Sequence, residues 1–255
     1  METITSKTNS KIEHAKKLLN KKYRKQSKTF LIETEKVVRQ ALFDGMKPIC
    51  FFVDEEKHFD FLQNVDCPIF KVSSVVFKTI SSLATPDGIV GEFEKRDSKK
   101  EYFGGNFLIL DNLQNPDNFG ALLRTAVATG FDKIYVINCA DEYSTKVTRA
   151  SMGNQFKIDI VHIDYDDIPI LFAGTKIFVA SMEGKNIFEI PNFEKNVGLI
   201  IGNEGNGVSS TARKYASDIL SIPMENGVES LNASVSASVI MYYIYSKSKK
   251  FQKVL

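Results

Sequence analysis

The sequence of 255 residues has no tryptophan, three cysteines and three histidines. The cysteines (Cys50, Cys67 and Cys139) are far apart and show no ligand spacing with the histidines, so we expect neither a disulfide framework nor a structural metal. No apolar run approaches the roughly 20 residues that span a bilayer, and the N-terminus lacks the apolar core of a secretion signal. With 43% apolar and 25% charged residues, a cytoplasmic globular protein is expected.

The net charge is small, +2 at pH 7, but the charged residues are unevenly distributed along the chain. Residues 1–30 carry nine basic residues against two acidic ones, a local net charge of +7. A basic stretch at the start of an otherwise acidic chain is what contact with a phosphate backbone requires. A solvated helix face explains such lysine runs equally well, so charge alone leaves both interpretations open.

The hydrophobic pattern changes near residue 100. Before it, helical and strand patterns mix in a small α/β unit that ends at the charged stretch EKRDSKKE (94–101), our linker candidate. After it, short apolar strands alternate with helices, which is typical of a parallel sheet covered on both faces. We expect strands at 106–111, 133–138, 157–163, 176–182, 197–202 and 219–224, and helices at 118–129, 145–151, 166–172, 209–216 and 232–247.

The first loop of the alternating region lies within LDNLQNPDNFGALLRTA (110–126), at the carboxyl end of a strand, where open α/β sheets bind ligands. A conventional Rossmann methyltransferase or dehydrogenase would show G-x-G-x-x-G at this turn, and the glycines are missing. Turn-forming residues do not require Arg124 in the following helix. The segment therefore favours a ligand site of another kind.

Two later segments also follow apolar strands. In LIIGNEGNGVS (199–209), Val208 stands where a phosphate loop needs lysine and Glu204 would repel phosphate, so a neutral or cationic ligand fits better than a phosphate. An ordinary glycine-rich turn is an equally good explanation. In ILSIPMENGVESLNASVSASVIMYY (219–243), Ser230 has the residue type of a helix N-cap. Small residues between Ala233 and Ser238 would let this helix pack close to another backbone.

Together, NPDNFGALLRTA, IGNEGNGVS and IPMENGVESLNAS resemble, in this order, the three motifs of the SpoU (TrmH) family of RNA ribose methyltransferases, over about residues 105–247. The stretches ITSKTNSKI, KYRKQSKTFLIE and ATPDGIVGEF more loosely resemble that family's ribosomal-protein-like substrate-binding domain. The resemblance implies an N-terminal RNA substrate-binding domain over 1–98. It also implies a SPOUT α/β-knot methyltransferase domain over 105–255, with a trefoil knot near 197–247.

The resemblance further implies a homodimer that transfers a methyl group from S-adenosylmethionine to a ribose 2′-hydroxyl in RNA, with ribosomal RNA favoured. By position, cofactor contacts fall on Ser181, Gly202, Ile222 and Leu231, and the catalytic set falls on Asn118, Arg124, Glu204, Ser230 and Asn232. RNA contacts of the N-terminal domain fall on Lys7, Asn9, Lys11, Arg24 and Lys25. No metal is implied.

Physical chemistry narrows some of these roles. A guanidinium is almost never deprotonated in a protein, so we expect Arg124 to hold an RNA phosphate and stabilise the developing oxyanion instead of acting as a base. Asn118 and Asn232 are expected to fix ribose and backbone geometry. Glu204 is expected to position Asn or Arg partners without touching substrate.

Three positions depart from the family pattern, and three other functions stay open. Asn226 and Thr34 stand where the family usually has glycine, and Asn115 stands where it often has aspartate. The alternatives are a tRNA 2′-O-methyltransferase, a non-catalytic RNA-binding or ribosome-assembly protein, and a small-molecule enzyme on a doubly wound sheet. Retention of every implied catalytic residue counts against the second, and the missing first-turn glycines count against the third.

Overall fold

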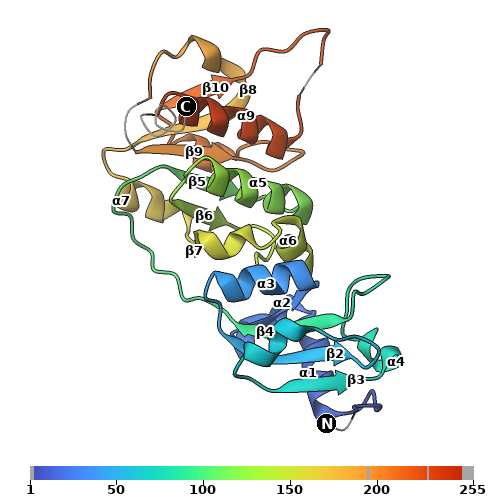
Figure 1. Ribbon diagram of the computed structural model, residues 1–255. Coiled ribbons are helices and arrows are strands. Elements are labelled where there is room, and N and C mark those ends of the chain that lie inside the picture. Colours follow the sequence, from blue (N-terminus) through green and yellow to red (C-terminus); the bar gives the residue numbers. More distant parts are fainter. Residues whose placement is uncertain (1–2, 194–195, 229, 249–255) are drawn as a thin grey trace. The chain divides into compact units, whose positions relative to one another are not determined.

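The computed structural model describes residues 3–193, 196–228 and 230–248 (Figure 1). Contacts divide the chain into two compact units. The first comprises residues up to 97 together with 141–156, and the second comprises 98–140 together with residues from 157 onward. Segment 141–156 lies between two strands of the second unit in sequence, so the alternating pattern gives no sign that it packs with the first. Within the described ranges, no helix is long and apolar enough to cross a membrane.

The first unit is built on a mixed four-stranded sheet in the order β1-β4-β2-β3, in which only the β2–β3 pair is parallel. Its strands are β1 (Thr29–Glu33), β2 (Pro48–Asp54), β3 (Ile69–Val72) and β4 (Ile89–Glu94). Helix α3 (Glu35–Phe43) packs in one apolar cluster of this sheet, and α1 (Ser10–Leu18) and α4 (Ser74–Phe77) pack in another. This unit also contains helix α6 (Thr145–Ala150), the 3-10 turn η1 (Asp60–Asn64) and most of the 3-10 turn η2 (Asn154–Lys157).

The N-terminal helical stretch is two helices and not one. The helical pattern predicts a continuous helix over 11–26, but α1 ends at Leu18 and α2 spans Lys21–Ser27. The break falls at Asn20, whose side chain accepts the backbone N–H of Lys22 at 2.9 Å and so caps the second helix. The spacing of the apolar residues does not reveal this interruption, because a polar residue at an exposed position such as Asn20 is also compatible with a continuous helix.

The second unit contains a six-stranded sheet in the order β10-β8-β9-β5-β6-β7, with every pairing parallel. This confirms the predicted parallel α/β fold. Its strands are β5 (Phe107–Asp111), β6 (Lys133–Ile137), β7 (Asp159–His162), β8 (Lys176–Asn186), β9 (Val197–Ile201) and β10 (Asp218–Ser221). Its helices are α5 (Pro116–Ala128), α7 (Ile168–Leu171), α8 (Ser210–Arg213) and α9 (Ala233–Ser246), with 3-10 turns η3 (Tyr165–Asp167) and η4 (Ile187–Glu189).

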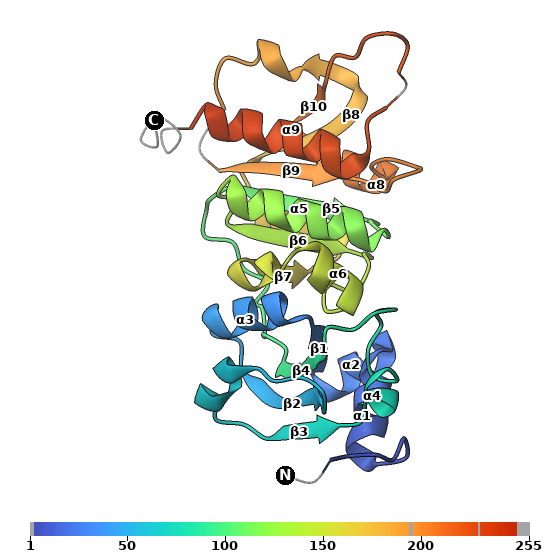
Figure 2. The same cartoon turned by 45° about the vertical axis from the view of Figure 1, so that its right-hand side comes forward.

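Both faces of this sheet are covered, because its central strands are apolar on both sides. Phe107 and Ile109 of β5 belong to the core cluster that α7 and α8 help to close. Leu108 and Leu110 are equally buried and point by alternation to the opposite face. Helices α5 and α9 run side by side over that face (Figure 2). Because helices cover both faces, the loops that could form a site lie at the carboxyl ends of the strands.

Strand β8 contains a bulge that the sequence pattern does not predict. The pattern predicts a strand over 176–182, whereas β8 continues to Asn186. On β10, Ile219 lies opposite Val179, but the next residue, Leu220, lies opposite Lys185. Residues 180–184 therefore leave the ladder and form a wall beside it. The trefoil knot implied near 197–247 stays a prediction.

Candidate active site

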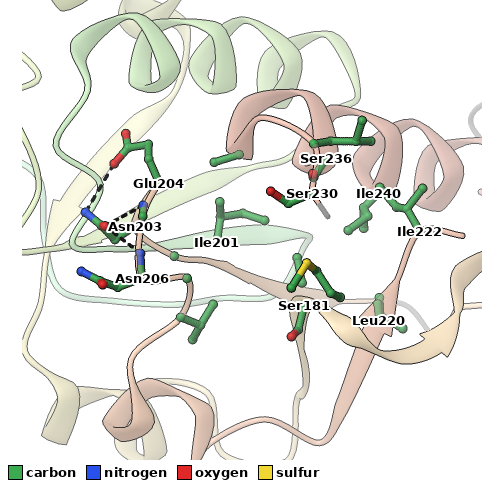
Figure 3. A pocket seen from close by; sticks show the side chains of 18 of the residues that line it. Ser181, Ile201, Asn203, Glu204, Asn206, Leu220, Ile222, Ser230, Ser236 and Ile240 are labelled. Carbon is green, nitrogen blue, oxygen red and sulfur yellow. Dashed lines mark hydrogen bonds between the residues drawn. The ribbon is translucent and has the colours of Figure 1, made fainter. Parts of the chain in front are cut away.

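A cavity of about 430 Å³ lies beside the β8 bulge and at the carboxyl ends of β9 and β10 (Figure 3). Its volume is within the range of pockets that hold small-molecule ligands. Five described segments line it: the β8 bulge, the end of β9 with the turn after it, α8 through Arg213, the end of β10 with the stretch after it, and α9 as far as Ile240. Ser181, Gly202, Ile222 and Leu231, the residues implied for cofactor contact, all line this cavity.

Apolar side chains form much of the wall. Leu220, Ile222 and Ile240 contribute from β10, the stretch after it and α9. At the rim, Met182 is 61% exposed and Leu231 is 37% exposed. Large apolar side chains left open to water at a cavity are suited to an apolar ligand surface that covers them, such as an aromatic ring.

The turn after β9 is closed and admits only glycine at its first position. A Cβ atom at Gly202 would lie 2.1 Å from the carbonyl carbon of Gly207. Asn203 and Gly207 exchange backbone hydrogen bonds of 2.9 Å, and the Asn203 Oδ1 atom accepts the N–H groups of Gly205 and Asn206. The turn thus presents a fixed row of backbone groups to the cavity.

A chain of hydrogen bonds joins the three sequence motifs beside this cavity. The Asn232 Nδ2 donates to the Asn118 Oδ1 at 3.0 Å, and the Asn118 Nδ2 donates to the Glu204 Oε1 at 3.2 Å. Asn118 is buried near the start of α5, where Asn115 caps the helix by accepting the N–H of Asp117 at 2.8 Å. Asparagine in place of the usual aspartate at 115 therefore keeps the capping oxygen.

The Glu204 carboxylate is held in its ionised form. Partial burial raises its pKa, but N–H groups of its own backbone, Asn115, Asn118 and Gln114 donate to it and lower the pKa more, so the net shift is downward. Its charge thus faces the first residues of α5 and serves to fix the loop that precedes this helix. No hydrogen bond joins Glu204 to Arg124 within the described ranges.

The start of α9 corrects one expectation. Asn232, and not Ser230, is the N-cap: its Oδ1 accepts the N–H groups of Ser234 at 2.9 Å and of Val235 at 3.4 Å. Both residue types cap helices well, so sequence alone could not choose between them. Ser230 is exposed and lines the cavity instead.

Arg124 stands apart from the other members of the implied catalytic set. It lies on α5 six residues beyond Asn118, about 9 Å along the helix axis, and is exposed. Arg124 does not line the cavity, and its guanidinium has no hydrogen-bond or ion-pair partner among the described residues.

The implied RNA contacts of the first unit divide into two kinds. Lys7, Lys11 and Lys25 are exposed, and Asn9 is the N-cap of α1. Arg24 is only 4% exposed: its guanidinium binds Asp141 at 2.7 Å and donates to the Leu18 carbonyl. Because its donors are used inside the first unit, Arg24 is a structural residue and we remove it from the candidate RNA surface.

The other two departures from the family pattern, at Asn226 and Thr34, differ in the backbone strain that they cause. Asn226 has φ 57° next to Gly227 with φ 69°, and asparagine is one of the residues that adopt this left-handed conformation readily. Thr34 has φ 76°, a region in which a β-branched side chain is strained. The loop near the cavity thus tolerates its substitution, whereas the turn before α3 carries strain.

Some cavity residues carry no signal in the sequence. Arg213 of α8 and Met182 of the β8 bulge line the cavity, but neither is among the site residues that the sequence predicts. Their placement depends on the bulge and on the start of α8, both of which are set by tertiary contacts. Within the described ranges, no group of three His, Cys, Asp or Glu side chains could hold a metal ion.

A parallel α/β sheet with these three motifs gathered at one cavity defines the class as the SpoU-type methyltransferases. Residues 105–242 match the SpoU rRNA Methylase family, and residues 9–91 match the MRM3-like substrate binding domain. The chain therefore belongs to the SpoU rRNA methylase family.

Relatives and solved structures resemble the chain over nearly its full length. The Bacillus subtilis 23S rRNA (guanosine(2553)-2′-O)-methyltransferase RlmP is 31% identical over 251 residues, covering 96% of this chain and 99% of that protein. Mitochondrial rRNA methyltransferase 3 of Mus musculus is 26% identical, covering 86% of this chain and 68% of that protein. The AdoMet-bound rRNA methyltransferase of Sinorhizobium meliloti superposes with a TM-score of 0.85 at 26% identity, covering 95% and 97% of the two chains.

Proposed function

We propose that this chain is an enzyme that transfers a methyl group from S-adenosylmethionine to a ribose 2′-hydroxyl in ribosomal RNA. The observation that carries the proposal is the hydrogen-bonded chain of Asn232, Asn118 and Glu204, which joins three motifs distant in sequence at the edge of one cavity. RlmP and rRNA methyltransferase 3 are named for ribosomal RNA, which favours it over transfer RNA as the substrate.

The cavity fits S-adenosylmethionine in size and in chemistry. Its apolar wall suits the adenine ring, and the backbone groups of the closed turn after Gly202 suit the polar edges of adenine and ribose. The ionised Glu204 beside the cavity favours a cationic ligand over an anionic one. When bound, the cofactor supplies the methyl group on a positively charged sulfur.

The asparagines are proposed to hold the ribose. An amide nitrogen carries two N–H groups, and each of Asn118 and Asn232 uses one in the hydrogen-bonded chain. The second N–H of each amide is available for a ribose oxygen. Because both amides are fixed by buried or capping contacts, the ribose would be held in one orientation, which is what an in-line displacement requires.

Arg124 is proposed to act across a homodimer. It lies outside the cavity of its own chain, yet α9 beside it carries Val235 and Tyr242, both about half-exposed and seven residues apart on one helical face. A second copy that covers this apolar face would bring one chain's Arg124 toward its partner's cavity. The guanidinium would then bind an RNA phosphate and stabilise the developing 2′-oxyanion.

Mixed dimers test this arrangement. Arg124→Ala and Asn118→Asp should each be nearly inactive alone, and mixing the two should restore activity in heterodimers that contain one intact site. Light scattering should give twice the chain mass for the wild type and one chain mass for Val235→Lys. No recovery on mixing, with heterodimers demonstrated by differently tagged chains, would contradict action across the dimer.

The first unit is proposed to bind the RNA outside the reacting nucleotide. Lys7, Lys11 and Lys25 are exposed on the basic stretch, and Lys11 lies 5.0 Å from the centre of the Phe70 ring. Residues 9–91 resemble a substrate-binding domain, which supports the same assignment. A cytoplasmic location, expected from the sequence, is part of the proposal.

The deciding experiment supplies the purified chain with S-adenosylmethionine carrying a labelled methyl group and separate rRNA and tRNA pools from cells that lack the gene. Label on one ribose of ribosomal RNA is expected. Label in transfer RNA would show that transfer RNA is the substrate instead. No label in either pool, despite cofactor binding, would favour the non-catalytic alternative. Glu204→Gln and Asn232→Asp are matched variants that should reduce the label without preventing folding.

A further inference from the structure

The β8 bulge brings one hydroxyl group to a cationic side chain at the cavity. Because residues 180–184 of β8 leave the ladder with β10, Ser181 lies on the cavity wall. Its Oγ accepts a hydrogen bond from the Arg213 Nη2 at 3.0 Å. Figure 3 shows Ser181 on the side of the cavity opposite Glu204. The two charged side chains that line the cavity among its described residues, Glu204 and Arg213, are therefore separated.

Arg213 is held where it is by the start of α8. The Ser209 Oγ caps this helix by accepting the N–H of Ala212 at 3.1 Å, and the Ser209 N–H donates to the buried Asp111 carboxylate at 2.7 Å. Asp111 in turn accepts the hydroxyl of Tyr165 at 2.7 Å. The backbone that carries Arg213 is thus anchored to the carboxyl end of β5 and is not a mobile surface turn.

The guanidinium lacks an anionic partner. Its hydrogen bond goes to the neutral hydroxyl of Ser181, and no carboxylate of the described residues lies within 4.0 Å of it. A guanidinium has five N–H donors, so most of its donors face the cavity or water. A half-buried cation without a counter-ion, at a cavity that is otherwise apolar or neutral on that side, provides a subsite for an anionic ligand group.

We propose that Arg213, held by Ser181, binds the α-carboxylate of the cofactor's methionine part. This inference rests on the proposed use of S-adenosylmethionine, whose only anionic group is that carboxylate. An RNA phosphate is the other candidate anion. The carboxylate fits better because Arg213 shares its cavity, and even its hydrogen-bond partner, with residues assigned to the cofactor, whereas Asn118 and Arg124 lie on α5.

Calorimetric titration of the full chain without RNA tests the subsite with two ligands. S-adenosylhomocysteine carries the carboxylate, and its decarboxylated analogue, S-adenosyl-3-thiopropylamine, keeps adenine, ribose, sulfur and amine but lacks it. Arg213→Met should weaken S-adenosylhomocysteine binding by about ten- to a hundredfold, since charge-assisted hydrogen bonds are lost. Its affinity for the decarboxylated analogue should stay within about twofold of the wild type.

Two further variants distinguish a loss of the charge-assisted hydrogen bonds from a general disturbance of the cavity. Arg213→Lys keeps the charge and should recover part of the affinity for S-adenosylhomocysteine. Ser181→Ala removes the hydroxyl that orients the guanidinium and should weaken only the carboxylate ligand, by less than Arg213→Met does. Thermal unfolding of each ligand-free variant establishes that it is folded before titration.

The outcomes separate this inference from the proposed function. Equal weakening of both ligands by Arg213→Met would make Arg213 part of the cavity wall and overturn the inference. Unchanged binding of both ligands with weaker RNA binding would assign Arg213 to a phosphate, which also overturns it. If the wild type binds neither ligand, the proposed cofactor itself is wrong and the inference falls with it.

Discussion

Replacement of Asn118 by aspartate tests whether the hydrogen-bonded chain beside the cavity works as described. The two side chains have nearly the same shape, so packing is preserved. The aspartate can still accept from Asn232 but cannot donate to Glu204, whose Oε1 lies 3.2 Å from the present Nδ2 atom. Two carboxylates would then face each other at a hydrogen-bond distance.

The cost can be bounded from this geometry. Two unit charges 3.2 Å apart repel by about 1 kcal/mol at the dielectric constant of water and about 5 kcal/mol at an effective value of about 20. Protonating one carboxyl with an ordinary pKa of 4.5 at pH 7 costs about 3 kcal/mol, which caps the loss. Because Glu204 is exposed, we expect a loss of about 1 to 3 kcal/mol in the free energy of unfolding.

The pH dependence is the diagnostic part. In the wild type, the lowered pKa of Glu204 contributes stability that is present above pH 4.5 and is lost as the pH falls through the folded-state value. In Asn118→Asp, repulsion raises the folded-state pKa of the pair above the unfolded values. The pair then takes up a shared proton at a higher pH than either carboxyl does in the unfolded chain, and the lost stability returns as the pH falls through that range.

Urea unfolding at pH 7 and pH 5 measures this difference. Asn118→Leu removes the same hydrogen bonds without adding charge, so its loss should be the same at both pH values. Adding Glu204→Gln to Asn118→Asp should recover stability at pH 7, because the repulsion is removed. An equal loss for Asn118→Asp at pH 7 and pH 5 would refute the assignment of Glu204 as the ionised neighbour of residue 118.

Three further outcomes are expected. Thr34→Gly should raise the free energy of unfolding by about 1 kcal/mol in urea titrations, because glycine relieves the strain at φ 76°; Thr34→Ala, which keeps the Cβ atom, should gain less. Arg124→Ala should lower methyl transfer by about a hundred- to a thousandfold while the melting temperature and cofactor affinity stay unchanged, and undiminished turnover would remove its proposed role. Lys7, Lys11 and Lys25 changed together to Gln should reduce the slope of log affinity for RNA against log salt by about 2 to 3, whereas the same change at the exposed Lys36, Lys57 and Lys78 should leave it unaltered.

The parallel sheet of the second unit was predictable because its strands are apolar on both faces. Strands such as β5 and β9 are continuous apolar runs bounded by polar turns, and helix α5 begins with Asn115 and Pro116, a capping residue followed by a residue favoured in the first turn. These signals are local, so they are readable from the sequence. The length of β8 is not local: its continuation to Asn186 depends on the register with β10.

Charge patterns show the same limit at Arg24. Within the sequence it belongs to a basic stretch and looks equivalent to Lys25. Its ion pair with Asp141 spans 117 positions in the chain, so only the fold reveals that its charge is already neutralised. A local net charge therefore predicted the basic stretch correctly as a surface feature but could not say which of its members remain available to a phosphate.

The hydrogen-bonded chain explains why the three motifs need these residue types. Asn232 both accepts from the N–H groups that open α9 and donates to Asn118, which an amide can do and an ionised carboxylate cannot. Asn118 likewise accepts from Asn232 and donates to residue 204, so an ionised aspartate in its place would lose the second hydrogen bond. Residue 204 then only accepts, from Asn118 and from the backbone before α5, which a carboxylate does with both oxygens. The donors all run toward Glu204, and an ionised carboxylate is the group that ends such a chain without leaving a polar atom unpaired.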